Sequence, residues 1–575
     1  MAVNYRLIEH TMFRIFRKHQ KVHEIDPDEI FLDAKNLPEF NVHQFEGRIE
    51  RPITKRAVVL LGMAGILISL IFIGRIADLQ ILQGDVYRAR AENNRLKHTP
   101  IFAPRGIIYD RTGTELAWNE QGEGDFPKRT YRDLAGLAHV LGYVAYPKKD
   151  SSGFYFQEDF VPKDGVELMY NDTLSGTRGL KITEVDVFGE VQSESTIELP
   201  KDGQNITLSV DARVQNELYK NMSSLAGEVG FAGGAAVIMD VETGEILALS
   251  SFPEYDPNVL TGGSDKKTIG KYLADKGTPF LNRAVGGLYA PGSTVKPFFG
   301  IAALNEGIIT PEKQILSTGS ISIPNPYFPE LPTVFKDWKA HGWVDIRRAL
   351  AVSSDVYFYE IGGGYGDQRG LGIARLEDYA RRFYLGALTN VDLPGEVGGV
   401  IPNPEWKKEN FNGEKWLIGN TYHTAIGQYG FQVTPIELAR AVAVVATGGK
   451  AVEPRVLLRI GDENAKTHIV SEDTTIAKEN FRIVREGMRL GVTEGIAQAL
   501  NVPYVEIAAK TGTAEIGSGK KLVHSWISGF FPYDHPRYSF VVIMSDGPRS
   551  NLKGAVFVMR GLFDWMAVNA KEYLE

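Results

Sequence analysis

The chain has 575 residues, of which 43% are hydrophobic and 23% charged, and its formal net charge is −8. This length is too great for one hydrophobic core and predicts about three or four structural units of ordinary globular composition. The negative charge, with no basic stripe in the C-terminal region, excludes nucleic acid as an expected partner. The sequence contains no cysteine, which excludes disulfides, thiol catalysis and cysteine-ligated zinc.

Residues 1–56 are predicted to be a cytoplasmic tail that precedes a membrane anchor. Within the tail, Leu7–Lys18 combines apolar and basic residues. This segment forms either a short amphipathic helix on anionic lipid or a loosely ordered tail, and the sequence leaves both open.

Residues 57–74 form an uncharged run, AVVLLGMAGILISLIFIG, bounded by Arg56 and Arg75. A helix over this stretch is roughly 27 Å long, close to the hydrocarbon thickness of a bilayer. A cleaved signal peptide is the rival interpretation, but the run begins late and no clean small-residue cleavage site follows it. We therefore predict an uncleaved single-pass anchor over residues 57–75 that contacts membrane lipid. Positive charges crowd its N-terminal side, which predicts a cytoplasmic N-terminus and an extracytoplasmic remainder.

Residues 76–212 are predicted to be a small, mostly β unit. Apolar residues at near-helical spacing in 75–95 indicate that the anchor helix continues outward. Ala103–Gly113 then alternates turn residues with a strand, and Gln204–Asp211 reads as another strand.

Residues 213–575 are predicted to be an α+β domain, in which helices cover an antiparallel sheet. A helix is expected at Val214–Leu225, and a middle region, 290–500, is mostly helical. The predicted strands are Gly234–Asp240, Glu245–Ser250, Trp526–Phe531 and Tyr538–Ser545, and a last helix runs from about Ala555 to Tyr573. The first and last elements of the domain therefore share one sheet.

The stretch Ala290–Pro297 places a serine, Ser293, three residues before a lysine, Lys296, just after a Pro-Gly turn. The apolar run Phe298–Leu304 behind it predicts a buried helix, and positions i and i+3 of a helix lie on one face. A serine becomes a nucleophile when a neighbouring base takes its proton, and a lysine can be that base when burial or positive charge lowers its pKa. Because Ser-x-x-Lys is common by chance, the pattern needs support from other motifs.

Two further motifs follow in order, Ser353-Ser354-Asp355 and Lys510-Thr511-Gly512. With Ser-x-x-Lys they resemble the signature of penicillin-recognising serine acyl transferases, although aspartate stands where that family usually has asparagine. The segment Arg105–Gly113 resembles the opening of the membrane-proximal pedestal of class B penicillin-binding proteins. Val356–Tyr359 resembles the elongation-type branch, penicillin-binding protein 2, and the resemblance covers about residues 100–575.

The resemblance implies catalytic roles for the first two motifs. Ser293 attacks the carbonyl of a D-Ala-D-Ala peptide, with Lys296 as base, and Ser353 relays the proton between Lys296 and the leaving amine. Asp355 is also assigned to the catalytic set. If ionised, it can only accept hydrogen bonds, and it would hold Lys296 protonated unless Lys510 shares the charge. Alternatively, Asp355 turns away and serves structure; we predict the first, because the family geometry puts both lysines around one serine.

The third motif is predicted to lie on a strand that edges the active site. The resemblance implies that Lys510, with the hydroxyls of Thr511 and Thr513, binds the terminal carboxylate of the substrate. Glycine at 512 fits because a side chain there would block close approach. The backbone N–H groups of Ser293 and Thr513 are the expected oxyanion hole.

No metal and no cofactor are predicted. His341 lies four residues after Asp337, and some elongation-type relatives hold zinc nearby with a cysteine. This chain has no cysteine, and an isolated Asp/His pair is usually a hydrogen bond. Gly427–Gly430, Thr434-Pro435 and Gly448-Gly449 are predicted to be turns and helix starts that frame the cleft, without chemistry of their own.

The resemblance implies an anchored D,D-transpeptidase that cross-links peptidoglycan stem peptides during elongation and is inhibited by β-lactams. A polytopic membrane glycosyltransferase is the implied partner, contacted through the anchor and the pedestal. Only a short stretch separates Trp118 from His139, where relatives carry an inserted head, so a shortened head is expected. Two alternatives remain: a serine protein that hydrolyses or senses β-lactams, and a catalytically silent scaffold of the cell-wall machinery.

Overall fold

The computed structural model describes residues 54–85, 96–121, 126–151, 155–157, 159–185, 191–325, 328–472, 475–517, 519 and 521–575. The chain divides into two units, Met1–Asn93 and Asn94–Glu575. The tail segment Leu7–Lys18, with its two alternatives, lies outside the described residues.

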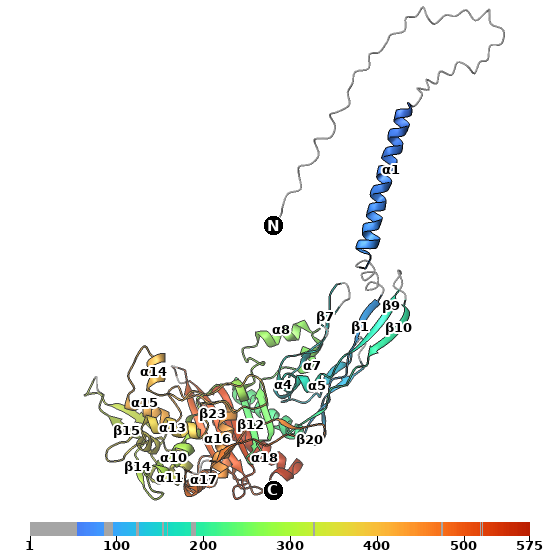
Figure 1. Ribbon diagram of the computed structural model, residues 1–575. Coiled ribbons are helices and arrows are strands. Elements are labelled where there is room, and N and C mark those ends of the chain that lie inside the picture. The colour runs from blue at the N-terminus through green and yellow to red at the C-terminus, as the bar shows by residue number, and fades with distance from the viewer. Residues whose placement is uncertain are drawn as a thin grey trace, which may run out of the picture. The chain divides into compact units, whose positions relative to one another are not determined.

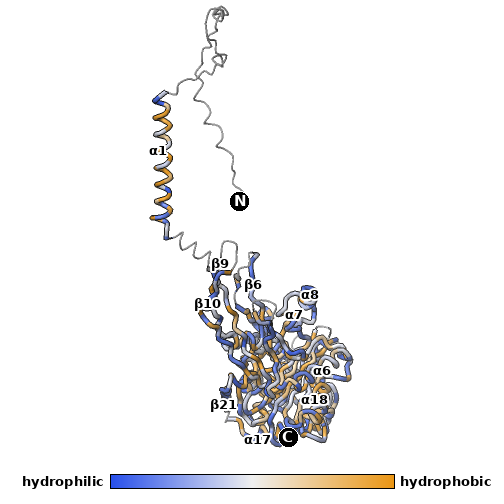
Figure 2. Tube along the Cα trace, turned by 90° about the vertical axis from the view of Figure 1, so that its right-hand side faces the viewer, coloured by the Kyte–Doolittle hydropathy of each residue, from blue (hydrophilic) through white to orange (hydrophobic). Residues whose placement is uncertain are grey.

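The first unit contains one long apolar helix, α1 (Lys55–Ala77), which continues as a π-helical turn, Asp78–Leu82. No residue of α1 is buried, and Figure 2 shows apolar residues along most of its length. Among the described residues, Lys55–Leu82 is the one helix long and apolar enough to cross a membrane, with a mean hydropathy of 2.7. The helix therefore covers the predicted anchor and extends beyond it as far as Leu82.

The first part of the second unit is mostly β. A three-stranded antiparallel sheet has the order β1-β9-β10, and a six-stranded sheet has the order β20-β19-β11-β2-β3-β4. The strands are β1 (Leu96–Ile101), β2 (Ile108–Tyr109), β3 (Glu115–Glu120), β4 (Lys128–Tyr131), β5 (Val144–Ala145), β6 (Lys148–Lys149), β7 (Tyr155–Gln157), β8 (Val161–Pro162), β9 (Gly179–Val185), β10 (Val191–Glu198), β11 (Ile206–Leu208), β19 (Leu457–Ile460) and β20 (Glu463–Asn464), and the helices are α3 (Ala138–Leu141), α4 (Gly165–Met169) and α5 (Asn171–Leu174). Because β19 pairs with β11, residues from far downstream complete the sheet of the predicted 76–212 unit.

A buried ionic cluster holds the interior of this β region together. The carboxylate of Glu167 accepts hydrogen bonds from Arg105 Nη2 at 2.7 Å and from Arg129 Nε at 2.7 Å. Burial alone raises the pKa of Glu167, but the two guanidinium charges outweigh burial, and the net pKa lies below its usual value. Arg105 of the Arg-Gly motif therefore packs inside the protein and ties residue 105 to residue 167.

The second part of this unit is built on a five-stranded antiparallel sheet with the order β13-β12-β24-β23-β22 (Figure 1). Its strands are β12 (Gly233–Asp240), β13 (Ile246–Phe252), β22 (Ala508–Ile516), β23 (Leu522–Phe531) and β24 (Tyr538–Pro548). The first two strands and the last three of this part share one sheet. The predicted α+β architecture is confirmed.

Both faces of this sheet are covered by helices, and alternation along β12 shows why. Ala235, Val237 and Met239 belong to one hydrophobic core with residues of α10 and α16, whereas Ala236 and Ile238 belong to a second core with α6 and α18. Side chains alternate across a strand, so a strand that is apolar at every position is buried on both faces. The helices are α6 (Ala212–Val229), α7 (Pro257–Gly262), α8 (Lys266–Ala274), α9 (Arg283–Gly286), α10 (Lys296–Asn305), α11 (Ile346–Val352), α12 (Asp355–Gly363), α13 (Ile373–Arg382), α14 (Pro404–Asn410), α15 (Ile418–Ala425), α16 (Pro435–Thr447), α17 (Lys478–Thr493) and α18 (Ala555–Asn569).

Helix α16 shows how the sequence sets its own boundaries. The Glu437 carboxylate accepts from the backbone N–H of Thr434 at 2.7 Å, and the Thr434 hydroxyl accepts from the N–H of Glu437 at 3.3 Å. This reciprocal cap satisfies donors that the helix itself leaves free, and Pro435 suits the first helical position. The helix ends at Thr447 and is followed by Gly448, whose φ of +76° is readily adopted only by glycine. The predicted helix start at Thr434-Pro435 is confirmed.

Three small antiparallel strand pairs complete the region around the helices. They are β14 (Ile315–Ser317) with β17 (Gly342–Val344), β15 (Ser320–Ile323) with β16 (Thr333–Lys336), and β18 (Lys450–Val452) with β21 (Ile469–Glu472). The first two pairs precede α11 and bring the chain to the start of the Ser353-Ser354-Asp355 motif.

Candidate active site

Ser293 lies on a 3₁₀ turn, Gly292–Val295, that leads directly into α10. The turn is held from behind, since the N–H of Gly292 donates to the carbonyl of Gly427 at 2.9 Å. A Cβ at position 427 would lie 2.2 Å from the carbonyl oxygen of Gly292, so only glycine allows this approach. Ser293 itself is half-buried, whereas α10 behind it is buried from Lys296 to Leu304. The serine therefore stands at the edge of the core on a fixed turn.

The side chain of Lys296 is fully buried and points to the second motif. Its Nζ donates to the carbonyl of Ser353 at 2.9 Å and approaches the Ser353 hydroxyl at 3.3 Å. It also lies 2.6 Å from Oδ1 of Asp355, whose side chain is 20% exposed. Asp355 therefore faces Lys296 and does not turn away from it.

Ser353 occupies the junction between α11 and α12 in a left-handed backbone conformation, with φ of +58°. This conformation turns both its carbonyl oxygen and its hydroxyl toward Lys296. The next residue, Ser354, caps α12, because its hydroxyl accepts from the N–H of Tyr357 at 3.3 Å. Because α12 begins at Asp355, the last residue of the motif, this cap fixes the backbone at the end of the motif.

Lys510 approaches the same hydroxyl from the edge strand β22. Its Nζ lies 2.7 Å from Ser353 Oγ and 2.8 Å from the carbonyl of Thr511, and the residue is 1% exposed. Burial lowers the pKa of Lys510 well below its usual value, and the positive charge of Lys296 lowers it further, although Asp355 opposes both effects. At a given pH, Lys510 is therefore unprotonated in a larger fraction of molecules than a lysine exposed to solvent would be.

Gly512 lets β22 lie against the turn that carries Ser293. A Cβ at this position would lie 2.8 Å from Thr294 Cγ2 and 2.9 Å from the carbonyl of Pro291. On the neighbouring strand, Trp526 pairs with Gly512 and its indole N–H donates to the carbonyl of Ala290 at 2.9 Å. Glycine is needed at position 512 because β22 lies so close to this turn. Thr511 is half-buried and Thr513 exposed.

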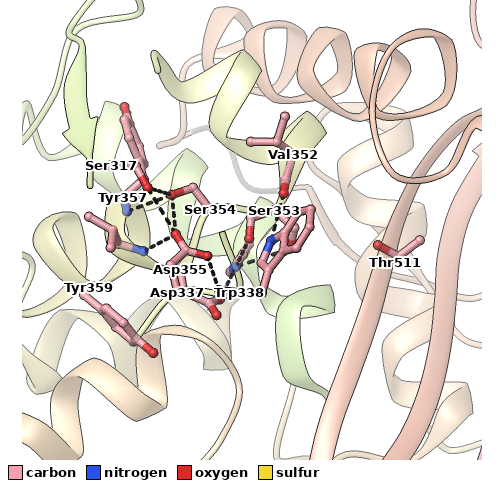
Figure 3. A network of polar contacts seen from close by, with 12 residues as sticks. Ser317, Asp337, Trp338, Val352, Ser353, Ser354, Asp355, Tyr357, Tyr359 and Thr511 are labelled. Carbon is pink, nitrogen blue, oxygen red and sulfur yellow. Dashed lines mark hydrogen bonds and ion pairs between the residues drawn. The ribbon is translucent and has the colours of Figure 1, made fainter. Parts of the chain in front are cut away.

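The structure thus brings Lys296, Ser353, Asp355 and Lys510 into direct contact, at the end of the turn Gly292–Val295 that carries Ser293. Sequence reasoning missed the contacts behind this group. Asp337, noted only as half of an Asp/His pair, binds the loop of the second motif, and Trp338 does so as well (Figure 3). The only signal was the proximity of Asp337 to the motif along the chain, which does not reveal a contact.

In the Asp337/His341 pair, Oδ1 of Asp337 and Nε2 of His341 are 3.6 Å apart. Burial lowers the pKa of His341, against the raising effect of Asp337. Within the part of the chain that the structure describes, no group of three or more His, Cys, Asp or Glu side chains is placed to hold a metal ion. The absence of a metal stays a prediction.

Comparison with known proteins places this site in a family. Residues 234–560 match the penicillin binding protein transpeptidase domain, and residues 125–208 match the penicillin-binding protein dimerisation domain. The peptidoglycan D,D-transpeptidase MrdA of Acinetobacter baumannii is 31% identical over 526 residues, which cover 86% of this chain and 75% of that protein. MrdA of Escherichia coli K12 is 27% identical over 617 residues, which cover 89% and 94%.

Solved structures of similar proteins point to the same family. Pseudomonas aeruginosa PBP2 in complex with WCK 5153 has a TM-score of 0.69 at 28% identity, covering 83% of this chain and 98% of that one. The complex of PBP2 and MreC from Helicobacter pylori has a TM-score of 0.67 at 26% identity, covering 82% and 99%. The chain belongs to the penicillin-binding protein transpeptidase family. Within that family it is an elongation-type class B penicillin-binding protein.

Replacing Asp355 with asparagine tests the charge beside the two lysines. We expect Asp355→Asn to keep the rate of penicillin acylation within about tenfold, roughly 1.4 kcal/mol in barrier. The acid limb of the rate profile should move to lower pH, because Asp355 raises the pKa of Lys510 and removing its charge lets that pKa fall. The measurement is the acylation rate with a fluorescent penicillin across pH. An unchanged profile together with a lower melting temperature would show that Asp355 serves the fold alone.

Proposed function

We propose that this chain is a peptidoglycan D,D-transpeptidase that cross-links stem peptides during cell elongation through an acyl-enzyme on Ser293. The observation that carries the proposal is the Ser353 hydroxyl, which lies 3.3 Å from Lys296 Nζ and 2.7 Å from Lys510 Nζ behind the turn of Ser293. The relatives named peptidoglycan D,D-transpeptidase support the choice of substrate.

The contacts suggest a route for the proton in acylation. The Ser353 hydroxyl lies between the side-chain nitrogens of Lys296 and Lys510, so it can carry a proton from Lys296 to Lys510 and leave Lys296 as a free amine. Lys296 is then free to take the proton of Ser293 as its oxygen bonds to the carbonyl carbon of the penultimate D-Ala. The Ser353 hydroxyl delivers its proton to the nitrogen of the terminal D-Ala as the C–N bond breaks, and it receives in its place the proton that Lys296 took from Ser293.

Deacylation reverses these roles. An amine of a neighbouring stem peptide attacks the ester carbon and loses a proton through the same relay, and the C–O bond to Ser293 breaks as the oxygen regains its proton. Lys510, with Thr511 and Thr513 beside it on β22, is proposed to bind the carboxylate of the donor peptide, and the N–H groups of Ser293 and Thr513 to bind the oxyanion.

Penicillin acylation separates this proposal from its alternatives. The wild-type chain is incubated with penicillin, the adduct is mapped by mass spectrometry, and its decay is followed. A long-lived adduct on the peptide that carries Ser293 supports a transpeptidase. Rapid turnover would favour a β-lactam hydrolase, and the lack of any adduct would favour a silent scaffold.

The chain is a single-pass membrane protein, and we propose that it works beside a polytopic glycosyltransferase. A structurally similar peptidoglycan synthase complex coordinates polymerization and crosslinking, which supports this partnership. Copurification of the two proteins through α1, and its loss when α1 is replaced by an unrelated span, tests the partnership.

The orientation of the anchor is a further prediction. Arg51, Lys55 and Arg56 crowd the N-terminal end of α1, so residues 1–56 should be cytoplasmic and residues after the helix extracytoplasmic. Protease added to cells whose outer barrier has been removed should digest the C-terminal unit and spare an N-terminal epitope tag. Digestion after detergent lysis is the control for tag accessibility. Loss of the tag in unlysed cells would overturn the orientation.

A further inference from the structure

A buried carboxylate that the mechanism does not use lies directly behind the Ser353-Ser354-Asp355 motif. Asp337 follows β16, and its side chain is completely buried. Figure 3 shows it at the centre of a polar network. Its Oδ2 accepts from the hydroxyl of Ser354 at 2.9 Å, from the N–H of Val356 at 3.0 Å and from the hydroxyl of Ser317 at 3.2 Å.

The network reaches the motif from both sides. Asp337 binds Ser354 within the motif and Val356 just past it. Before it, the indole N–H of Trp338 donates to the carbonyl of Val352 at 3.2 Å, while the backbone N–H of Trp338 donates to Oδ1 of Asp337 at 2.8 Å. The backbone is therefore held on both sides of Ser353, by Asp337 after it and by Trp338 before it, and Trp338 is itself bonded to Asp337.

This anchoring matters because Ser353 is in a strained conformation. A non-glycine residue with φ of +58° costs about 1–3 kcal/mol and persists only where its surroundings determine it. The same conformation directs the carbonyl and the hydroxyl of Ser353 to Lys296. A relaxed backbone would move the hydroxyl away from one or both lysines.

We propose that Asp337 is a positioning residue for acyl transfer: it fixes the backbone of the second motif so that the Ser353 hydroxyl meets Lys296 and Lys510 together. Asp337 touches neither substrate nor the reacting atoms and acts through Ser354 and Val356. The proposal rests on the proposed function, in which Ser353 carries the proton.

The contacts also show why an amide cannot replace this carboxylate. Each oxygen of Asp337 faces N–H donors, Val356 on one side and Trp338 on the other. An asparagine side chain has one accepting atom and one NH₂ group, so in either orientation it turns a donor toward a donor. Asp337→Asn keeps the volume of the side chain but removes its negative charge and its ability to accept on both sides.

The test compares Asp337→Asn with Asp345→Asn. Asp345 caps the other end of α11, where its Oδ1 accepts from the N–H of Arg348 at 2.8 Å, and none of its contacts described here reaches Ser353. Binding and acylation by a fluorescent penicillin are measured separately, at a temperature where both variants are folded. Asp337→Asn should lower the first-order acylation constant roughly 10- to 100-fold while the binding constant changes little, because a displacement of about 1 Å costs on that order. Asp345→Asn should lower the melting temperature and keep the acylation constant.

Equal acylation constants for the two folded variants would overturn the positioning role. If Asp337→Asn does not fold, Ser354→Ala and Ser354→Thr decide the question, since threonine keeps a hydroxyl for Asp337 and alanine does not. Slow acylation by Ser354→Ala with recovery in Ser354→Thr supports the proposal, and equal rates contradict it. Failure of the wild-type chain to form an adduct on Ser293 would refute the proposed function instead, so the two failures are distinct.

Discussion

Replacing Ser293 with alanine should abolish the penicillin adduct and leave the thermal transition almost unchanged. The substitution removes the only oxygen proposed to bond to the acyl carbon, so acylation should fall by at least about 10⁴-fold, as for other serine nucleophiles. Ser293 is half-buried, and its turn is held by the backbone of Gly427 rather than by the serine side chain. The loss of one hydroxyl there should cost at most about 1 kcal/mol of folding free energy.

Intact-protein mass spectrometry after incubation with penicillin measures this effect, with thermal unfolding as the companion measurement. Ser264→Ala is the matched control, since Ser264 is exposed just before α8 and should leave labelling intact. An adduct of undiminished yield in Ser293→Ala would refute the nucleophile assignment.

Replacing Lys296 with methionine should lower both activity and stability. The rate of acylation should fall by about 10³-fold, because the proposed base for the serine proton is lost. The Asp355 carboxylate, 2.6 Å from Lys296 Nζ and only 20% exposed, then loses its counter-charge. Removing one partner of a buried pair typically costs about 3–5 kcal/mol, and the partial exposure of Asp355 places this case at the low end.

The double variant Lys296→Met/Asp355→Asn separates the loss of activity from the loss of stability. Neutralising the stranded carboxylate should restore much of the melting temperature and leave acylation as slow as in the single variant. The pKa of Lys510 should rise in Lys296→Met, since the charge of Lys296 lowers it, so any residual acylation should require higher pH. Recovery of acylation in the double variant would contradict the role of Lys296 as base.

The motifs and the layering were predictable from the sequence because each has a local signal. Alternation and apolar runs indicated the strands of the five-stranded sheet and the helix behind Ser293, and the spacing of Ser293 and Lys296 is a property of one turn of helix. The orientation of Asp355 was not predictable in the same way. Both orientations satisfy the sequence, and only the packing of α10 against the start of α12 decides between them.

Two other features lay beyond sequence reasoning for a related reason. The contact of Asp337 with Ser354 joins a strand end to a helix start through a single side chain, and a lone aspartate in a turn carries no sign of its partners. Strand β19 pairs with β11 from far downstream, and so short a strand has too few residues for a recognisable alternation. The predicted boundary at residue 212 could not anticipate this pairing.

Because β19 pairs with β11, the mostly β part of this unit contains a strand from within the part that is built on the five-stranded sheet, so the two parts are not simply joined by a linker. Asp392 reinforces this connection, because its carboxylate accepts from the N–H groups of Val456 and Leu457 at 2.6 and 2.9 Å and from the hydroxyl of Tyr170 at 2.5 Å. A protein that begins at residue 213 would keep β19 and lose β11, leaving an open strand edge prone to association with other chains. The pairing also connects the region before residue 212 to α16. A displacement of β11 acts directly on β19, which follows α16 in the chain, and α16 packs against the five-stranded sheet.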